Sequence, residues 1–336
     1  MGKKNGDAKK IMYPHSQAKL DYYQSYLSRY LPILRLADFT ERIFIFDVFC
    51  GTGIYEDGTK GSPILAFEAI KKSHYKHLKK TLTPVSLCVN DLDSSKINGV
   101  KKYISGKNKE NYCALGFYNK DANEFLNDII TCLQEQTTKS RNLVLIDPYG
   151  YKNIRKEDLG KLLSKRNTEI ILFLPISNIY RFSGNVVNDD DRCVEGLRDF
   201  IYSFFPDETH PIRNSKASSE KEFIEHIRTA LNFDDEYYST SFYLQRDNRG
   251  HYFAMFSITP NLKGLEKIVE VKWALNDETG EGFELPKPMQ GLFDNEFKQK
   301  AKEDLFNRLK TLVVDFISKK KSVNNNELYD FPLNSQ

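Results

Sequence analysis

The stretch FDVFCGTGIYEDGTKGSP, residues 46–63, decides the fold of this chain. It continues an apolar run at residues 43–46 and places Asp47 shortly before the glycines Gly51 and Gly53. Glycine lets the backbone pass close to a ligand where a Cβ would collide, so this pattern is typical of a buried strand that ends in a ligand-binding turn. The stretch therefore predicts an α/β domain with its binding loop after the first strand.

Apolar runs and helical patterns alternate along the rest of the chain. After a first helix at residues 16–37, the runs at 42–49, 85–91, 111–119, 142–150 and 169–177 predict strands. Helices are expected near residues 63–72, 94–104, 122–135, 155–165, 191–205 and 219–232. Residues 237–245 and 251–260 flank RDNRG and indicate a hairpin rather than another crossover. This order predicts a mainly parallel sheet, covered by helices on both faces, with a C-terminal antiparallel hairpin.

Composition excludes several classes of protein. The 336 residues are 40% apolar and 28% charged, which is enough for a sizeable core. No run reaches the length of roughly 18 apolar residues that a membrane span needs, and the first residues lack the apolar segment of a signal peptide. The five cysteines show no C-x-x-C spacing, which argues against a disulfide framework and a zinc site. We expect a soluble, cytoplasmic protein that holds no metal and has no membrane segment.

The loop after the first strand favours one cofactor over another. A nicotinamide-binding fingerprint would have a third glycine where this chain has Glu56, whose charge would repel a pyrophosphate at the following helix. S-adenosylmethionine has no phosphate, and its ammonium can be accepted by a carboxylate such as Asp47. The loop thus favours S-adenosylmethionine, although a plain strand-to-helix turn would also explain Gly51 and Gly53.

Two further acids follow the second and third expected strands. Asp91 ends the run CVND and can accept both hydroxyls of a ribose, with Asp93 as the second choice. Asp121 precedes an expected helix, where it either accepts the adenine amino group or serves as an ordinary N-cap. Both roles remain open for Asp121.

The segment LVLIDPYGY, residues 143–151, is the candidate for catalysis. Asp147 closes an apolar strand, Pro148 stiffens the exit, and Tyr149 offers a flat face. The segment resembles the Asp-Pro-Pro-Tyr motif of amino-methyltransferases, in which the acid holds the target amine and the ring stacks on the base. It departs from that motif at Tyr149, which replaces proline, so a capped strand end with a tight turn is the alternative.

The ordered blocks at residues 46–70, 146–154, 256–275 and 291–294 resemble the three-Cys-motif partner proteins, over about residues 15 to 295. The resemblance implies a Rossmann-like class I methyltransferase fold, S-adenosyl-L-methionine as cofactor, and a radical-chemistry partner protein that carries the three cysteines. It also implies that Lys19 in the first helix faces the site, although the residue alone fits a solvated helix position equally well. The expected cofactor-binding residues are Asp47, Phe49, Gly51, Gly53, Asp91 and Asp121, and the expected catalytic residues are Asp147, Pro148, Tyr149 and Lys19.

The expected organisation has three parts: an N-terminal helical segment at 1–40 that packs on the core, a methyltransferase-like domain at 41–285, and a helical extension at 286–336 that resembles the opening of a winged-helix domain. Two functions follow. The first is a methyltransferase that acts on a nucleic-acid base or on a product of a partner enzyme. The second is a non-catalytic partner module of a modification or defence complex. The sequence does not indicate an oligomeric state.

Overall fold

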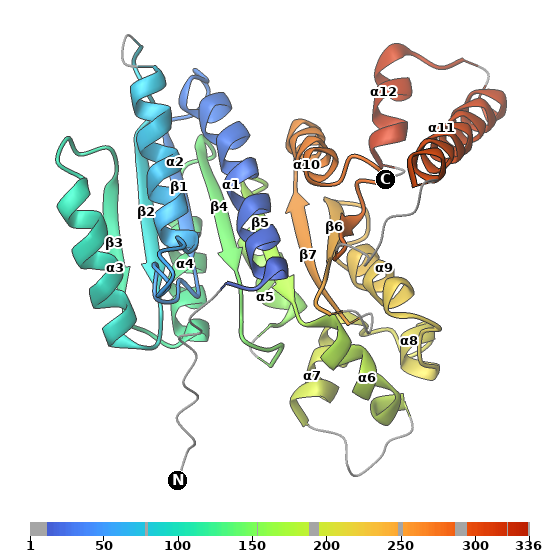
Figure 1. The fold of residues 1–336 in the computed structure, drawn as a ribbon, viewed down its shortest axis with the longest axis horizontal. Helices are drawn as coiled ribbons and strands as arrows, with labels where there is room; N and C mark the ends of the chain where they lie inside the picture. Colours follow the sequence, from blue (N-terminus) through green and yellow to red (C-terminus); the bar gives the residue numbers. More distant parts are fainter. Residues whose placement is uncertain are drawn as a thin grey trace.

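A computed structural model describes residues 12–77, 80–152, 154–187, 195–247, 251–285, 294–320 and 322–334. This part of the chain forms one eight-stranded sheet in the order β3-β2-β1-β4-β5-β7-β6-β8 (Figure 1). The strands are β1 (Arg42–Asp47), β2 (Val85–Asn90), β3 (Ala114–Tyr118), β4 (Ser140–Ile146), β5 (Thr168–Leu174), β6 (Tyr238–Gln245), β7 (Tyr252–Thr259) and β8 (Gly282–Phe283). Only the pairings of β7 with β5 and β6 are antiparallel among these strands. The expected α/β class, mainly parallel sheet and late hairpin are therefore confirmed.

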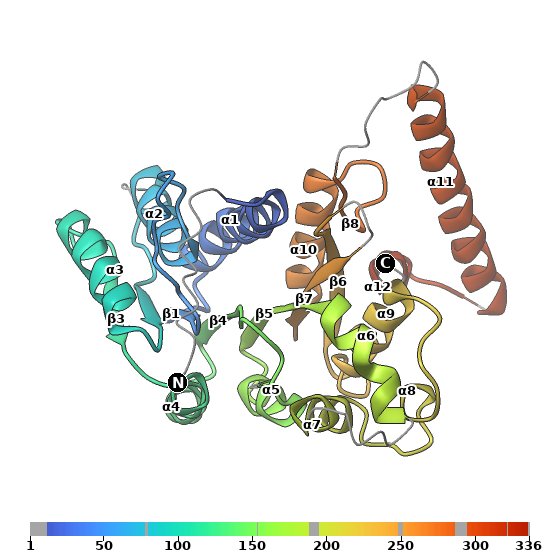
Figure 2. The same ribbon diagram turned by 60° about the horizontal axis from the view of Figure 1, so that its bottom comes forward.

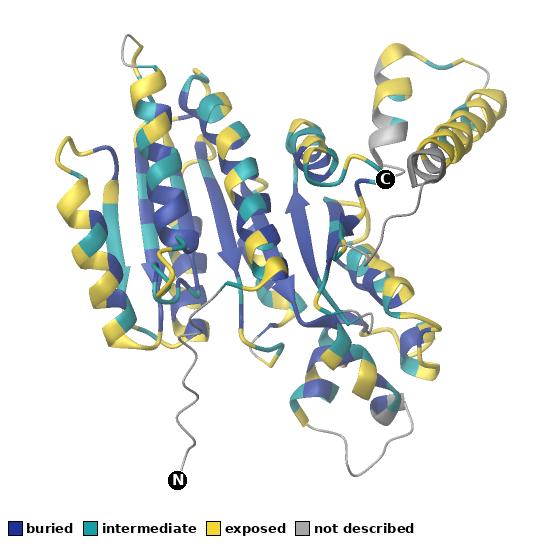
Figure 3. Cartoon of the chain, in the orientation of Figure 1, coloured by how far each residue is buried: buried dark blue, intermediate teal, exposed yellow. Residues whose placement is uncertain are grey.

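Helices cover both faces of the sheet (Figure 2). One face carries α1 (Pro14–Arg35), α2 (Ser62–Lys76), α3 (Ser94–Lys107) and α10 (Leu262–Leu275). The other carries α4 (Ala122–Glu135), α5 (Lys156–Leu163), α6 (Ile176–Val187), α7 (Glu195–Phe204), the short α8 (Pro211–Asn214) and α9 (Glu220–Ala230). The central strands are buried from both sides, as Figure 3 shows, which explains why their sequences are nearly continuous apolar runs.

The first helix belongs to the core. Its aromatic residues recur at helical spacing, and Tyr22, Tyr23, Tyr26 and Leu27 are each at most 1% exposed. The helix packs against α2 and α10, and the hydroxyls of Tyr22 and Ser257 lie 2.8 Å apart, which joins α1 to β7. Burial of this one face explains why the sequence pattern predicted the helix to within two residues at each end.

The expected strand at 169–177 is partly wrong. It ends at Leu174, and α6 begins at Ile176, a helix that the sequence pattern did not predict. The carbonyl of Pro175 accepts hydrogen bonds from the amides of Asn178 and Ile179, so the proline starts the helix while it ends the strand. Because the end of β5 and the start of α6 are both apolar, the sequence pattern did not reveal where the strand ends and the helix begins. The helix expected at 191–205 appears as α7, and its first residues lie outside the described part.

The C-terminal extension consists of α11 (Asp294–Lys319) and α12 (Asn325–Asn334), which follow the layered core and contact it at its α10 side (Figure 1). The Nζ of Lys302 on α11 lies 3.1 Å from Asp277 Oδ2, and the Tyr329 hydroxyl on α12 donates to Glu266 on α10. Phe306 remains 66% exposed on α11. Across the described residues, no helix has the length and apolar character that a membrane crossing requires.

Candidate active site

The predicted residues gather at one edge of the sheet, outside the carboxyl ends of the parallel strands (Figure 1). In the sheet, β2 and β3 lie on one side of β1, whereas β4 and β5 lie on its other side. The crevice at such a switch point is the usual ligand site of an open α/β sheet. Two cavities adjoin there: the Asp147 pocket, about 530 Å³, and the Asp91 cavity, about 710 Å³. They share Phe49, Pro148 and Tyr149 as lining residues.

The loop after β1 depends on its glycines. Gly51 and Gly53 have φ values of +64° and +73°, which residues other than glycine rarely adopt. A Cβ on Gly53 would lie 2.7 Å from Cγ2 of Val100 on α3, so Gly53 also allows close packing. A Cβ on Gly51 would meet no atom within 4 Å, which leaves its backbone open toward the Asp147 pocket. Gly53 therefore shapes the turn, while Gly51 offers backbone to a ligand.

Asp47 lies behind the wall of the Asp147 pocket. Its side chain is fully buried, and the Ser62 hydroxyl, which lines the pocket, donates to Asp47 Oδ2 at 2.6 Å. Asp47 Oδ1 has no hydrogen-bond partner within the described residues. Burial raises the pKa of Asp47 to about 7, although the bond from Ser62 opposes the shift. The expectation that Asp47 reaches a ligand directly is not met by this geometry, because Ser62 rather than Asp47 forms the wall.

Asp91 is fixed at the edge of its cavity by main-chain donors. Its Oδ2 accepts from the Gly51 amide at 3.0 Å, and its Oδ1 accepts from the Asp93 amide at 2.9 Å. An ionised carboxylate has about four acceptor positions, so two remain for a ligand. Asp93, the second choice, caps α3 by accepting from the Ser95 amide at 2.8 Å.

Asp121 has the N-cap role and also lies at the Asp91 cavity. Its carboxylate caps α4 by accepting from the Asn123 amide at 2.9 Å, and the residue also lines the Asp91 cavity. A capping carboxylate keeps acceptor positions for a ligand. Asp121 therefore lies within the cavity that Asp91 defines.

Lys96 is a site residue that sequence reasoning missed. Its Nζ donates to the Tyr149 hydroxyl at 3.0 Å and lies 3.8 Å from Asp91 Oδ1. Burial lowers the pKa of Lys96, but the hydrogen bond to Tyr149 and the nearby negative charges raise it by more, so the lysine stays charged. A lysine in the first turn of the helix after CVND was the available signal. Lys96 thereby connects α3 to Tyr149, which is 75% exposed at the junction of the cavities.

Lys19 faces the site, and its interpretation as a solvated helix residue is wrong. Its Nζ donates to Asp147 Oδ2 at 2.5 Å, and the two side chains are 18% and 20% exposed. The same Nζ lies 4.6 Å from the centre of the Phe173 ring. Burial lowers the pKa of Lys19, but the charge of Asp147 and the hydrogen bond to it raise it by more. The pocket thus contains an ion pair at the end of β4.

Aromatic rings form one wall of the Asp147 pocket. His15 and Phe253 stack with centroids 5.0 Å apart, and Phe253 and Phe173 stack at 5.1 Å, each pair with planes inclined by 28°. Tyr13 stacks on the outer side of His15 at 5.4 Å. These rings come from the start of the chain, from β5 and from β7. Sequence reasoning missed them because the position of β7 beside β5 is not encoded in periodicity.

Cys50 lies in the loop after β1 and lines the Asp147 pocket. Its thiol is buried, and burial together with the charges of Asp47 and Asp91 raises its pKa far above physiological pH. The cysteines among the described residues, Cys50, Cys88, Cys113 and Cys132, are free, whereas Cys193 lies outside that part. Nowhere in the described ranges do three His, Cys, Asp or Glu side chains gather as a metal site.

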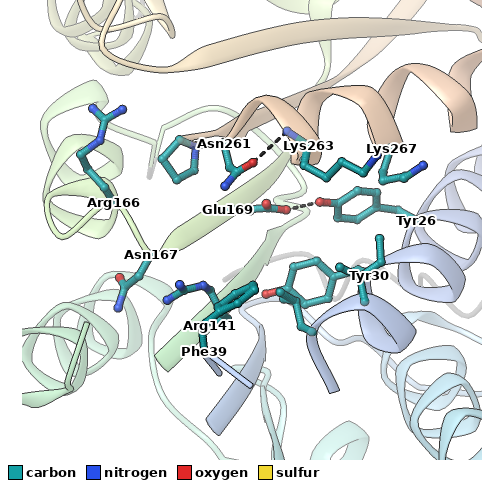
Figure 4. Close-up of a pocket in the computed structure, with 14 residues that line it drawn as sticks. Tyr26, Tyr30, Phe39, Arg141, Arg166, Asn167, Glu169, Asn261, Lys263 and Lys267 are labelled. Carbon is teal, nitrogen blue, oxygen red and sulfur yellow. Dashed lines mark hydrogen bonds between the residues drawn. The ribbon is translucent and has the colours of Figure 1, made fainter. Parts of the chain in front are cut away.

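A smaller cavity of about 160 Å³ lies at the opposite, amino-terminal edge of the strands (Figure 4). There Glu169 of β5 accepts hydrogen bonds from Tyr26 and, at 3.0 Å, from Thr259. Lys263 and Lys267, on its rim, pair with Glu266. The cavity is smaller than the roughly 300 Å³ of ordinary small-molecule sites, and it lies away from the switch point. We therefore assign the candidate active site to the carboxyl edge.

Comparison with known proteins adds no family. No protein-family model matches the chain, and no curated protein matches it significantly.

Proposed function

We propose that this protein is an S-adenosylmethionine-dependent methyltransferase that acts on an amine of a nucleic-acid base. The observation that carries the proposal is the junction of the two cavities at the switch point. One cavity contains Asp91, the other contains the pair of Lys19 and Asp147, and Pro148 and Tyr149 line both. A cofactor and a substrate can therefore meet beside Asp147. Five parallel strands followed by an antiparallel pair, the inventory of class I methyltransferases, also support the proposal.

The residues of the Asp91 cavity fit the cofactor. Its volume of about 710 Å³ suits a ligand of this size. The remaining acceptor positions of Asp91 suit the two ribose hydroxyls, and Asp121 would accept from the adenine amino group. When bound, S-adenosylmethionine supplies an activated methyl group. The protein has to provide orientation and a dry environment for the transfer.

The Asp147 pocket provides these conditions for an amine on a flat ring. Tyr149, which is 75% exposed at the junction of the cavities, offers a face for the ring, and the stacked rings of His15, Phe253 and Phe173 form an apolar wall of the pocket. The Asp147 carboxylate would accept a hydrogen bond from the amine and aim the nitrogen lone pair at the methyl carbon. It would also take the proton that the nitrogen loses when its bond to that carbon replaces the carbon's bond to sulfur. Lys19 bonds only Oδ2 of Asp147, so Oδ1 keeps acceptor positions for the amine while the nearby face of Phe173 helps to hold the lysine cation.

Calorimetric titration with S-adenosylhomocysteine tests the cofactor assignment. We expect micromolar affinity, equivalent to roughly −8 kcal/mol. Asp91→Asn should weaken binding by roughly 1 to 3 kcal/mol, because buried ribose hydroxyls would lose a charged acceptor. Glu135→Gln, at the exposed end of α4, removes the same charge away from the cavity and should leave affinity unchanged. Absence of binding by the intact protein would refute the cofactor assignment.

The ion pair of Lys19 and Asp147 also favours a second function, that of a non-catalytic partner module. The carboxylate that should receive the amine is already paired with Lys19, and the motif departs from Asp-Pro-Pro-Tyr at Tyr149. Both features fit a non-catalytic partner module, which would act beside a three-Cys-motif protein. Such a module could bind S-adenosylmethionine or lack that affinity, so cofactor binding does not identify it. It would be identified by the absence of radiolabelled methyl transfer to RNA, to DNA or to a product of that partner.

A further inference from the structure

A polar cavity of about 410 Å³ adjoins the Asp147 pocket, and we call it the basic cavity. Asn178 and Arg246 line both, so the two are continuous. The walls of the basic cavity come from the first turns of α6, from Lys216 ahead of α9, and from the ends of β6 and β7 that face this edge of the sheet (Figure 1). A ligand in the Asp147 pocket can therefore extend into the basic cavity without leaving the protein surface.

Three cations in the basic cavity are available to an anion. Arg181, Lys216 and Arg246 are exposed, and within the described residues no carboxylate forms an ion pair with any of them. Instead, Lys216 Nζ lies 4.2 Å from the centre of the Tyr180 ring, and the Arg246 guanidinium lies 5.9 Å from that of Phe253. Aromatic faces hold cations in place without neutralising them.

The acids near these cations are engaged elsewhere. Glu220, which lines the basic cavity, accepts from the Ser177 hydroxyl at 2.6 Å and from the Tyr252 amide at 3.3 Å. Asp247 Oδ2 lies 2.9 Å from Nδ1 of His251. With three exposed cations against one lining carboxylate, the basic cavity keeps a positive charge.

We propose that the basic cavity binds backbone phosphates of a single-stranded nucleic acid whose base enters the Asp147 pocket, an inference that rests on the proposed methyltransferase function. An exposed aromatic ring such as Tyr149 beside a positively charged groove is the combination that binds single strands. The base has to leave a duplex to reach the mostly buried Asp147, and its flanking phosphates then lie at the mouth of the pocket. An acidic peptide would use the cations but would have no need of the stacked wall formed by His15, Phe253 and Phe173.

The test measures fluorescence anisotropy of a labelled single-stranded RNA oligonucleotide with the full chain, in the presence of S-adenosylhomocysteine and across a range of salt concentrations. The variant Arg181→Ala/Lys216→Ala should bind roughly tenfold or more weakly for each lost charged contact. The slope of log affinity against log salt should become shallower by about 0.7 for each lost phosphate contact. A matched control, Lys101→Ala/Lys102→Ala on the exposed face of α3, removes the same charge and should change neither quantity.

The outcomes separate this inference from the proposed function. Equal losses in the two double variants would overturn the basic cavity as a specific site, and so would competition by polyglutamate as effective as that by RNA. A nucleoside monophosphate that binds as tightly as the strand would overturn the claim of a polynucleotide. Calorimetric binding of S-adenosylhomocysteine without RNA or DNA binding would overturn this inference alone. RNA binding that depends on Arg181 and Lys216, in a protein that binds no cofactor, would support the basic cavity and refute the methyltransferase.

Discussion

At the scale of single residues, the ion pair of Lys19 and Asp147 is the feature on which the proposed activity depends. Both side chains are mostly buried, and removing one partner of such a pair leaves an uncompensated charge that destabilises the fold. A loss of activity in a single variant therefore has two explanations, a catalytic and a structural one. Removing both charges together separates them.

We expect Asp147→Asn to bind S-adenosylhomocysteine as the unmodified protein does, while methyl transfer to nucleic acid falls roughly 100-fold or more, because the acceptor of the amine is lost. The double variant Lys19→Met/Asp147→Asn should recover the melting temperature of the unmodified protein but not its activity. Melting curves, calorimetry and transfer of a tritiated methyl group measure the three quantities. If the double variant recovers activity along with stability, Asp147 has only a structural role.

The buried Asp47 predicts a pH dependence of stability. Its folded pKa of about 7 exceeds its ordinary value of 3.8, so the folded state binds more protons than the unfolded state between these values. The contribution of Asp47 to the free energy of unfolding is therefore complete below pH 3.8 and is lost as the pH rises toward 7, by up to about 1.4 kcal/mol per pH unit.

Asp47→Asn should remove this part of the pH dependence. Relative to the unmodified protein, the variant should gain stability steadily between about pH 4 and pH 7 and then remain level. Urea unfolding of both proteins at a series of pH values measures the difference. Parallel profiles would mean that Asp47 is ionised throughout, with a partner that compensates its burial.

At the scale of helices and strands, the sequence was most informative where one periodicity governed a whole element. The aromatic stripe of α1 and the amphipathic pattern of α4 were assigned with close boundaries, because each helix buries one face. The boundary between β5 and α6 was missed because both elements are apolar on either side of Pro175. Periodicity cannot distinguish a buried strand from the start of a buried helix.

The helices α11 and α12 should contribute little to the stability of the core. Lys302 with Asp277 and Tyr329 with Glu266 attach them through exposed polar groups, which are worth little individually. We expect a chain that ends at residue 285 to melt within about 5 °C of the full chain and to keep its affinity for S-adenosylhomocysteine. Calorimetric melting and titration check both. A much larger drop would show that these helices are part of the cooperative unit.

At the scale of the whole molecule, the two sides of the candidate site differ in how far they could be predicted. The glycine loop, Asp91 and Asp121 follow strands that succeed one another along the chain, so local patterns identified them before the fold was known. The Asp147 pocket instead collects Lys19, Phe173 and Phe253 from distant segments, and Phe253 reaches it because β7 lies beside β5. No local pattern states which strands become neighbours, so the aromatic wall and the basic cavity had no signal in the sequence.

The reversed direction of β7 also bears on how the molecule assembles. Residues that meet between α1 and β7, such as Tyr22 and Ser257, are 235 positions apart, so this contact closes a very long loop of chain. The described lining of the Asp91 cavity comes from residues 48–152 and needs no such closure. During synthesis the first helix has to wait for β7 before it finds its final surroundings, whereas the segments around Asp91 can associate much earlier. The Asp91 cavity would thus form before the Asp147 pocket during synthesis. An incomplete chain could then bind the proposed cofactor without binding the proposed substrate.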